Sequence, residues 1–298
     1  MKDAVHKDQG RSITLKAPAK INLFLKVIKR RPDGYHEIIS LMQKVELFDI
    51  LHIAREGETI ILSCPGSGLP EDQDNLVYRA AQGFFAATGE KAGIRIVLEK
   101  NIPVAAGLGG GSSDAAAVVK GLNALLGTGL NRERLVQIAR PLGADVPFFI
   151  QDSSAAIATG IGDCLEEFEP IRGSWLLLVN PGFGLSTKWV YENFPLTTGT
   201  NPYILARVRK MQRNKLEATP ALFKEFVNDL EVVSIGRFPE IGDIKNELKQ
   251  GGAVVSLMSG SGPTVFGLFS SEEEAQRSFL QLSKKYGENV FLVRPYIP

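Results

Sequence analysis

The chain has 298 residues, enough for one large domain or two ordinary ones with a sizeable core. Its 34 Lys and Arg residues nearly balance 33 Asp and Glu residues, and a net charge of +1 supplies no field to recruit nucleic acid or an anionic membrane surface. A hydrophobic content of 44% with a charged content of 22% excludes the disordered, fibrous and collagen-like classes of protein.

We expect neither a targeting signal nor a membrane-spanning segment. The polar start of the chain carries Asp3 and Asp8, unlike a secretory signal or an Arg-rich transit peptide. The longest apolar runs, such as that at residues 175–179, are far shorter than the ~18 residues of a membrane span. Two cysteines, Cys64 and Cys164, are too few for a disulfide framework or a cysteine-built metal site. These features predict a cytoplasmic protein in a reducing compartment.

A β-hairpin is predicted near the start of the chain. Residues 19–28 alternate between apolar and polar side chains, which indicates a half-buried strand with Lys20 and Asn22 on the face opposite the apolar one. Residues 29–34 end in Pro-Asp-Gly, a combination typical of a chain reversal, and residues 37–54 continue in a β-like pattern.

A helix and a glycine-rich crossing follow the hairpin. Residues 75–88 have helical spacing and end at a glycine. Residues 94–99 alternate as another strand, which leads through the glycine-rich segment 107–111 into an apolar helix over residues 115–126. Three consecutive polar residues can cap this helix: Ser112, Ser113 and Asp114.

The rest of the chain mixes helices and strands. A helix over residues 132–140 leads to a short turn at 143–147, and a capping box of Ser271 with Glu274 opens a later helix. Four strands are expected in this part of the chain: residues 175–179, 253–257, 264–269 and 290–293.

The glycine-rich loop carries the sharpest chemical signal. Glycines at positions 107, 109, 110 and 111 can turn backbone N–H groups inward, and the helix that follows adds partial positive charge, so phosphate is the expected guest. The loop lacks the lysine of the Walker pattern and the spacing of the Rossmann fingerprint. The structural alternative is that the glycines only permit a tight strand-to-helix crossing.

Lys20, Asn22 and Asp145 are the candidate reactive side chains. Phosphoryl transfer needs a phosphate cradle, a cation on the moving group and a carboxylate near the accepting hydroxyl, and the loop, Lys20 and Asp145 supply one of each. The alternatives are a solvated strand face for Lys20 and Asn22 and a simple turn residue for Asp145.

Other polar clusters carry weaker signals. Tyr35 and His36 can stack on a base or hydrogen-bond to it, although an aromatic pair beside a turn is more often simple packing. The three histidines lack metal-ligand spacing, and no nucleophile-elbow motif supports a hydrolase. A basic cluster within residues 207–215 has no interleaved aromatic residues, so we interpret it as a solvated helix face and expect no nucleic-acid partner.

Three segments in order resemble the motifs of the GHMP kinase family: residues 18–23, 103–116 and 259–264. The likeness extends from about Ile13 to Val293. It implies an α+β fold of two domains, a ribosomal-protein-S5-like amino-terminal domain over residues 1–170 and a ferredoxin-like carboxy-terminal domain over residues 171–298. The active site is then expected between them.

Two further elements, residues 32–37 and 143–147, resemble the branch of this family that acts on a cytidine-diphosphate substrate. The resemblance implies ATP-dependent phosphorylation of the 2-hydroxyl of the methylerythritol part of that substrate, in the non-mevalonate isoprenoid route. It implies that Asp145 is the catalytic carboxylate and Lys20 its cationic partner, that Asn22 contacts substrate near the transferring group, and that Tyr35 and His36 hold the cytosine.

The resemblance also assigns the phosphates of ATP to one continuous segment, formed by Pro103, Val104, Ala105, Ala106, Gly107, Leu108, Gly109, Gly110, Gly111, Ser112 and Ser113. Mg²⁺ should accompany ATP, and Ser113 is the first candidate ligand although no metal site is assigned. We expect a monomer or a homodimer. The residues before about position 12 and the segment 197–224 match nothing in the family pattern.

Three other functions remain open from the sequence. The first is a GHMP kinase that acts on a mevalonate derivative, homoserine or a sugar, against which the Asp-Gly-Tyr-His element at residues 33–36 argues. The second is a nucleotide-binding regulator without turnover, which would not need both Lys20 and Asp145. The third is a structural nucleic-acid-binding module, against which the near-neutral charge argues.

Overall fold

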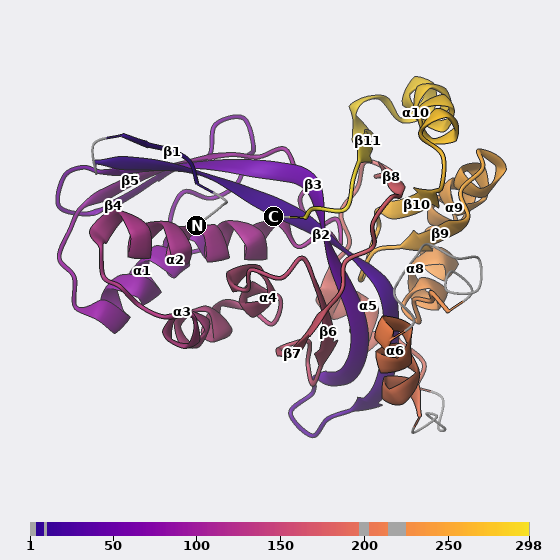
Figure 1. Ribbon diagram of the computed structural model, residues 1–298, viewed down its shortest axis with the longest axis horizontal. Coiled ribbons are helices and arrows are strands. Elements are labelled where there is room, and N and C mark those ends of the chain that lie inside the picture. Colours follow the sequence, from indigo (N-terminus) through magenta and orange to yellow (C-terminus); the bar gives the residue numbers. More distant parts are fainter. Residues whose placement is uncertain (1–3, 9–10, 197–202, 214–224, 298) are drawn as a thin grey trace.

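The computed structural model describes residues 4–8, 11–196, 203–213 and 225–297, which form two sheets with helices packed against them (Figure 1). The first sheet has the order β1-β2-β3-β5-β4, with β6 paired to β3 and β7 to β6. Among these described strands, β4 and β5 run parallel and the other pairs are antiparallel. Its strands are β1 Ala4–Asp8, β2 Ser12–Arg30, β3 His36–Arg55, β4 Ile60–Ser63, β5 Ile94–Glu99, β6 Ala155–Thr159 and β7 Cys164–Phe168.

Helices from the first half of the chain cover one end of this sheet. They are α1 Leu76–Thr88, α2 Gly110–Leu126, α3 Arg132–Ala139, the short 3-10 turn Arg140–Leu142, and α4 Val146–Ile150. Helix α2 is Ala-rich, ten of its 17 residues are buried, and it packs against β2, α1 and α4. Gly121 lets it approach β2 closely, since a Cβ there would lie 2.5 Å from the Leu15 side chain.

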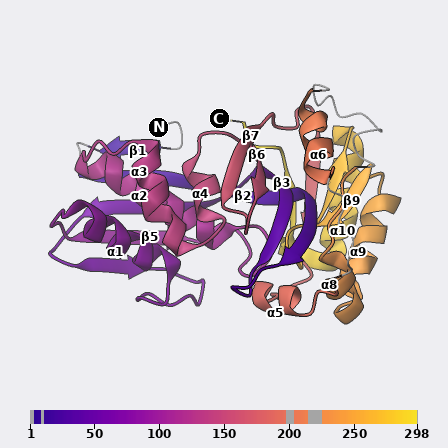
Figure 2. The same ribbon diagram turned by 90° about the horizontal axis from the view of Figure 1, so that it is seen from below.

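The second sheet has the order β11-β8-β10-β9 and is antiparallel throughout. Its strands are β8 Trp175–Val179, β9 Val255–Met258, β10 Val265–Phe269 and β11 Val290–Val293. The helices of this half are α5 Thr187–Glu192, α6 Ile204–Arg213, α8 Glu231–Arg237, α9 Glu240–Gln250 and α10 Glu272–Tyr286, followed by the 3-10 turn Gly287–Asn289. Figure 2 shows α9 and α10 at the outer side of this sheet.

Alternation along β8 explains how the two sheets meet. Leu177 and Val179 belong to the apolar cluster that includes α9 and α10, whereas Leu176 and Leu178 belong to the cluster that includes Ile21 of the first sheet. Successive side chains of a strand point to opposite faces, so the second sheet buries one face under its helices and the other against β2, β3 and β6.

The β2–β3 hairpin runs through both halves of the molecule. Its strands are 19 and 20 residues long, and Leu15 lies in the core beneath α2, Ile21 in the core between the sheets, and Val27 in the core of the second half. Both faces of β2 are therefore covered in its middle. The prediction of a half-buried strand is wrong there: Lys20 and Asn22 are 4% and 3% exposed, so neither lies on a solvated face.

Most predicted elements are confirmed. Helix α1 begins after the Asn75 side chain accepts a hydrogen bond from the Val77 N–H, and it ends at Gly89 with φ +73°. Ser271 caps α10 by accepting a hydrogen bond from the Glu274 N–H, as expected of a capping box. The turn after Arg30 joins the two strands of the predicted hairpin.

The start of helix α2 differs from the prediction. The helix begins at Gly110 instead of residue 115, and Gly109 is its N-cap, so Ser112, Ser113 and Asp114 lie inside it and cap nothing. Gly109 has φ +70°, a left-handed conformation that favours glycine and lets the chain enter the helix directly from the loop.

The two segments that match nothing in the family pattern are only partly described by the structure. The segment 197–224 falls outside the described residues except for 203–213, which are described as a turn and α6, and residues 4–8 form β1 beside β2. The first sheet ends at Phe168 and the second begins at Trp175. Within the described ranges, no helix is long and apolar enough to cross a membrane.

Candidate active site

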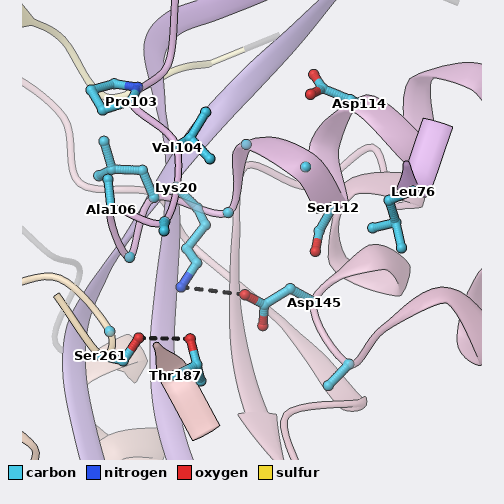
Figure 3. Close-up of a pocket in the computed structure, with 18 of the residues that line it drawn as sticks. Lys20, Leu76, Pro103, Val104, Ala106, Ser112, Asp114, Asp145, Thr187 and Ser261 are labelled. Carbon is cyan, nitrogen blue, oxygen red and sulfur yellow. Dashed lines mark hydrogen bonds and ion pairs between the residues drawn. The ribbon is translucent and has the colours of Figure 1, made fainter. Parts of the chain in front are cut away.

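A cavity of about 530 Å³ lies between the two halves of the molecule. Its walls come from β2, from the loop that leads into α2, from the segment before α4, and from α5 and the turn after β9 in the second half (Figure 3). The cavity is lined by Lys20, Asn22 and Asp145 and by every residue from Pro103 to Ser112. The structure thus brings together the three candidate reactive side chains and nearly all of the predicted phosphate loop.

Lys20 occupies the centre of this site. Its Nζ lies 3.4 Å from Oδ2 of Asp145 and donates a hydrogen bond of 2.6 Å to Oδ1 of Asn22. Its backbone N–H donates to the Leu108 carbonyl at 2.8 Å, so the glycine-rich loop is attached to β2 at Lys20 itself. Figure 3 shows the ammonium directed at the Asp145 carboxylate. The ammonium is thus fixed by β2 and held beside the loop.

Asp145 has the N-cap position of α4, yet within the described part of the chain its carboxylate makes no capping hydrogen bond. Pro147, in the first turn of α4, and the buried Phe148 fix the backbone here. The Asp145 side chain is 33% exposed, in contrast to 5% for Lys20. Its carboxylate is therefore open to the cavity on one side and paired with an ammonium on the other.

The glycine-rich loop is held from both halves of the molecule. The Gly107 carbonyl accepts a hydrogen bond from the Ser259 hydroxyl at 2.9 Å, and the Ala106 carbonyl accepts one from the Thr264 N–H at 3.3 Å. A Cβ on Gly107, which has φ +75°, would lie 2.1 Å from the Ser259 carbonyl oxygen. Only glycine fits this close approach.

The start of α2 continues the glycine-rich loop along the cavity wall. Gly110, Gly111 and Ser112 begin the helix, and the first N–H groups of a helix have no partner within it. These residues line the cavity, and the helix dipole favours negative charge there. The arrangement suits the phosphates of a nucleotide.

The turn after β9 closes the site from the second half. Gly260 has φ +56°, and a Cβ there would lie 3.1 Å from Oδ1 of Asn22 and 3.4 Å from Nζ of Lys20. The buried Asn228 holds this turn, since its Nδ2 donates to the Met258 carbonyl at 2.7 Å and to the Gly260 carbonyl at 2.8 Å. The turn is therefore fixed directly against Lys20 and Asn22.

A buried ionic cluster supports the entry to the loop. Nζ of Lys100 contacts the carboxylate of Asp49 and lies 2.9 Å from Oδ2 of Asp114. Oδ1 of Asp49 accepts from the N–H groups of Asn101 and Ile102 at 2.6 and 2.9 Å. Burial raises the pKa of Asp114 well above its usual value, whereas the two carboxylates outweigh burial and raise the pKa of Lys100.

His36 and Tyr35 have different surroundings. The His36 ring is 8% exposed and packs against Tyr191 of α5 with 5.3 Å between ring centroids, whereas Tyr35 is 61% exposed. Burial, and then the charge of Arg30, lower the pKa of His36, so its ring is neutral at pH 7. Burial and the nearby Asp145 charge raise the pKa of Tyr191. Tyr191 lines the cavity, but Tyr35 and His36 are not among its described lining residues.

The sequence alone did not single out the lining residues from α5. Thr187 and Tyr191 belong to this helix, and the Thr187 hydroxyl lies 2.9 Å from that of Ser261, facing Lys20 and Asp145 across the cavity (Figure 3). No spacing signal marks them, because they enter the site through packing of the two halves.

The candidate metal ligand Ser113 has a buried hydroxyl without a hydrogen-bond partner in the described structure, and it does not line the cavity. Among the described residues, no group of three or more His, Cys, Asp or Glu side chains is placed to hold a metal ion.

Comparison with known proteins decides the family. Residues 75–153 match the GHMP kinases N terminal domain and residues 215–288 match the GHMP kinases C terminal domain. A protein of Syntrophotalea carbinolica named 4-diphosphocytidyl-2-C-methyl-D-erythritol kinase is 49% identical, with 94% of this chain and 97% of the relative covered. The chain belongs to the GHMP kinase family.

Further similarities place this GHMP kinase within a group of similarly named relatives. A protein of Geobacter metallireducens with the same name is 44% identical over 96% of this chain and the whole of the relative. A crystal structure of 4-(cytidine 5'-diphospho)-2C-methyl-D-erythritol kinase has a TM-score of 0.77 at 33% identity, covering 94% of this chain and 98% of its own. Homoserine kinase from Cytophaga hutchinsonii has the same TM-score at 20% identity, over 97% of this chain and 96% of its own, and shares the fold. The α+β GHMP kinase fold predicted from the sequence is confirmed.

Proposed function

We propose that this GHMP kinase transfers the γ-phosphoryl group of ATP to the 2-hydroxyl of 4-diphosphocytidyl-2-C-methyl-D-erythritol. The products are the 2-phosphate and ADP, and the reaction belongs to the non-mevalonate route to isoprenoid precursors. One observation carries the chemistry: the Lys20 ammonium lies 3.4 Å from the Asp145 carboxylate, beside a glycine loop that opens into the first turn of α2. The relatives' names support the choice of substrate.

The proposed reaction begins with ATP phosphates on the backbone N–H groups of the loop and the α2 start. We propose that Asp145 accepts or orients the proton of the attacking hydroxyl, and that the Lys20 ammonium, 3.4 Å from the Asp145 carboxylate, stabilises negative charge on the hydroxyl oxygen and on the moving phosphoryl group. Phosphoryl transfer requires mainly positioning and charge stabilisation. In this proposal the loop positions the phosphates and the Lys20 ammonium stabilises the charge.

The substrate's base is proposed to lie toward the hairpin turn. His36 presents a neutral ring against Tyr191, and Tyr191 reaches the cavity. Tyr35 projects on the exposed side of the same turn, so its contact with cytosine stays a prediction. Asn22 also stays a prediction as a substrate contact, because both ends of its amide already bond to protein groups.

Mg²⁺ fits this site as a companion of ATP. Mg²⁺ prefers oxygen ligands and is commonly held by substrate phosphates, water and one or two carboxylates. Among the described residues, Ser112 lines the cavity in the first turn of α2, and its hydroxyl would add an oxygen ligand to such a site. When bound, the ion would neutralise charge on the phosphate oxygens.

Other expectations from the sequence remain proposals. We propose domain limits at residues 1–170 and 171–298, although the hairpin tip of the first part packs into the core of the second. A cytoplasmic location and a monomeric or homodimeric state also stay predictions.

The proposed function is tested by coupled ADP release with Mg-ATP and one of three acceptors: the cytidine substrate, mevalonate or homoserine. We expect turnover with the cytidine substrate alone. Turnover with mevalonate or homoserine instead would contradict the choice of acceptor, and ATP binding without turnover on any of them would favour the non-catalytic alternative.

A further inference from the structure

We propose that Ser40 is a positioning residue for phosphoryl transfer: its hydroxyl holds the Asn22 side chain so that the Asn22 amide oxygen stays directed at the Lys20 ammonium. Ser40 lies on β3, is 0% exposed, and does not line the cavity among the described residues. Its hydroxyl bonds to the side chain of Asn22, which does line the cavity, and so reaches the site through that residue. The inference rests on the proposed function, because it concerns the same reactive group.

The hydrogen bonds around Ser40 run in one direction. Lysine has only donors, so the atom of Asn22 that lies 2.6 Å from Nζ of Lys20 is the amide oxygen. The amide nitrogen then donates to the Ser40 hydroxyl at 2.7 Å. Ser40 in turn donates to the Phe24 carbonyl at 2.8 Å, and a carbonyl can only accept. Each of the three hydrogen bonds therefore has one consistent direction, from donor to acceptor.

Strand geometry explains why a hydroxyl on β3 can reach Asn22. The β2–β3 ladder shifts register between Asn22 and Phe24, and Ser40 pairs with Leu25 across it. A β-bulge interrupts regular pairing and redirects neighbouring groups. Ser40 thus lies at the irregular point of the ladder, next to the two β2 residues that it bonds.

The consequence concerns the Lys20 ammonium. One of its three N–H groups bonds to Asn22 and a second faces Asp145 at 3.4 Å, which leaves the third for a phosphate oxygen. The terminal torsion of an asparagine is broad, so without Ser40 the amide can turn away. The ammonium would then close on Asp145 and occupy the carboxylate that the acceptor hydroxyl requires.

The first test is Ser40→Ala in steady-state kinetics. Ser40→Ala removes the group that holds the Asn22 amide and so loosens the bond from Asn22 to the charged Lys20 ammonium. Because hydrogen bonds to charged groups are among the stronger ones, we expect kcat to fall about 10-fold while KM for ATP changes less than about 2-fold. Ser40→Thr retains the hydroxyl and should recover most of kcat. Ser256→Ala is the matched control, since Ser256 is also buried and its hydroxyl has no hydrogen-bond partner in the described ranges. It should retain the parent kcat.

A double-mutant cycle separates positioning from packing. In an Asn22→Ala background, Ser40→Ala should change kcat no further, because the group that it positions is gone. An equal fall in kcat in both backgrounds would overturn the proposal, as would a Ser40→Ala enzyme with the parent kcat.

An NMR measurement makes the test independent of turnover. The Asn22 side-chain amide signals, identified by their loss in Asn22→Ala, should shift in Ser40→Ala and remain in place in Ser256→Ala. If the parent enzyme shows no turnover with the cytidine substrate, the proposed function fails while the amide signals still decide the Ser40 contact. Unshifted signals in Ser40→Ala would refute the contact.

Discussion

Replacing Asp145 with asparagine removes the carboxylate charge and leaves the shape of the side chain. We expect Asp145→Asn to lower kcat by on the order of 10²-fold or more, the range for loss of a positioned general base. The affinity for ATP should not fall, because the loop and the start of α2 are held by other contacts, from Lys20, Ser259 and Thr264.

The ion pair supports this magnitude. At an effective dielectric of about 20, unit charges separated by 3.4 Å interact by about 5 kcal/mol. Water screens part of this energy, since Asp145 is one-third exposed. A 100-fold fall in rate corresponds to about 2.7 kcal/mol of transition-state stabilisation, which is about half of the unscreened interaction. The structure therefore makes a large effect on kcat reasonable for one uncharged substitution.

The assay is steady-state ADP release with the cytidine substrate, accompanied by direct measurement of ATP binding. Asp152→Asn is a suitable control, because Asp152 is an exposed aspartate a short distance along the same chain. It should behave as the parent enzyme. A kcat for Asp145→Asn within about threefold of the parent would refute the assigned role, given the range expected for a general base.

Three further predictions concern the supports of the site. Gly109→Val should weaken ATP binding and lower kcat, because Gly109 has φ +70° and a Cβ there would lie 3.0 Å from Cγ of Lys20 and 3.1 Å from Phe149; binding and rate are measured on the same preparation. Asn228→Ala should destabilise the protein by on the order of 3 kcal/mol in urea unfolding, because the Met258 and Gly260 carbonyls lose a buried donor. The free energy of unfolding should also fall as the pH drops below 6.5, because His36 has a lowered pKa in the folded protein. As the pH falls below the pKa of His36 in the unfolded chain, the unfolded state takes up a proton before the folded state does. The free energy of unfolding therefore declines until the pH reaches the lower pKa of His36 in the folded protein.

Each of these has a distinct control or contrary outcome. Gly83→Ala should retain the parent's affinity for ATP, since a Cβ there meets nothing within 4 Å, and a Gly109→Val protein with unchanged affinity would mean that the glycines serve only the chain crossing. A loss below about 1 kcal/mol in Asn228→Ala would show that other groups satisfy the two carbonyls. His36→Gln should flatten the fall in stability toward low pH, and an equal fall in both proteins would place its origin elsewhere.

Local signals explain which elements the sequence predicts. Three short signals each determine the backbone conformation of a few residues: Pro-Asp-Gly before Tyr35, Gly89 after α1, and the Ser271–Glu274 box. The structure confirms the turn, the helix end and the helix start that they predict. The glycine-rich loop before α2 is predicted for the same reason, because its glycines and the helix after it are contiguous in sequence, and its binding of phosphate stays a prediction.

Features that depend on distant parts of the chain were not predicted. Lys20 is buried because the second sheet and the Gly260 turn cover it, which alternation along β2 cannot reveal. Helix α2 starts early because Gly109 itself makes the N-terminal turn, whereas the polar residues after it had suggested a cap. The contact between His36 and Tyr191 joins residues 155 positions apart, and no short motif encodes it.

The central claim is tested most directly by identifying the phosphorylated carbon of the product. The 2-hydroxyl of a 2-C-methyl sugar alcohol is on a tertiary carbon, so a phosphate ester there has no hydrogen on the carbon that bears it. We predict ADP and phosphorylated product in equal amounts, with a new ³¹P resonance that shows no three-bond coupling to hydrogen. A product resonance that shows such coupling, or ADP release without a phosphorylated product, would contradict the account.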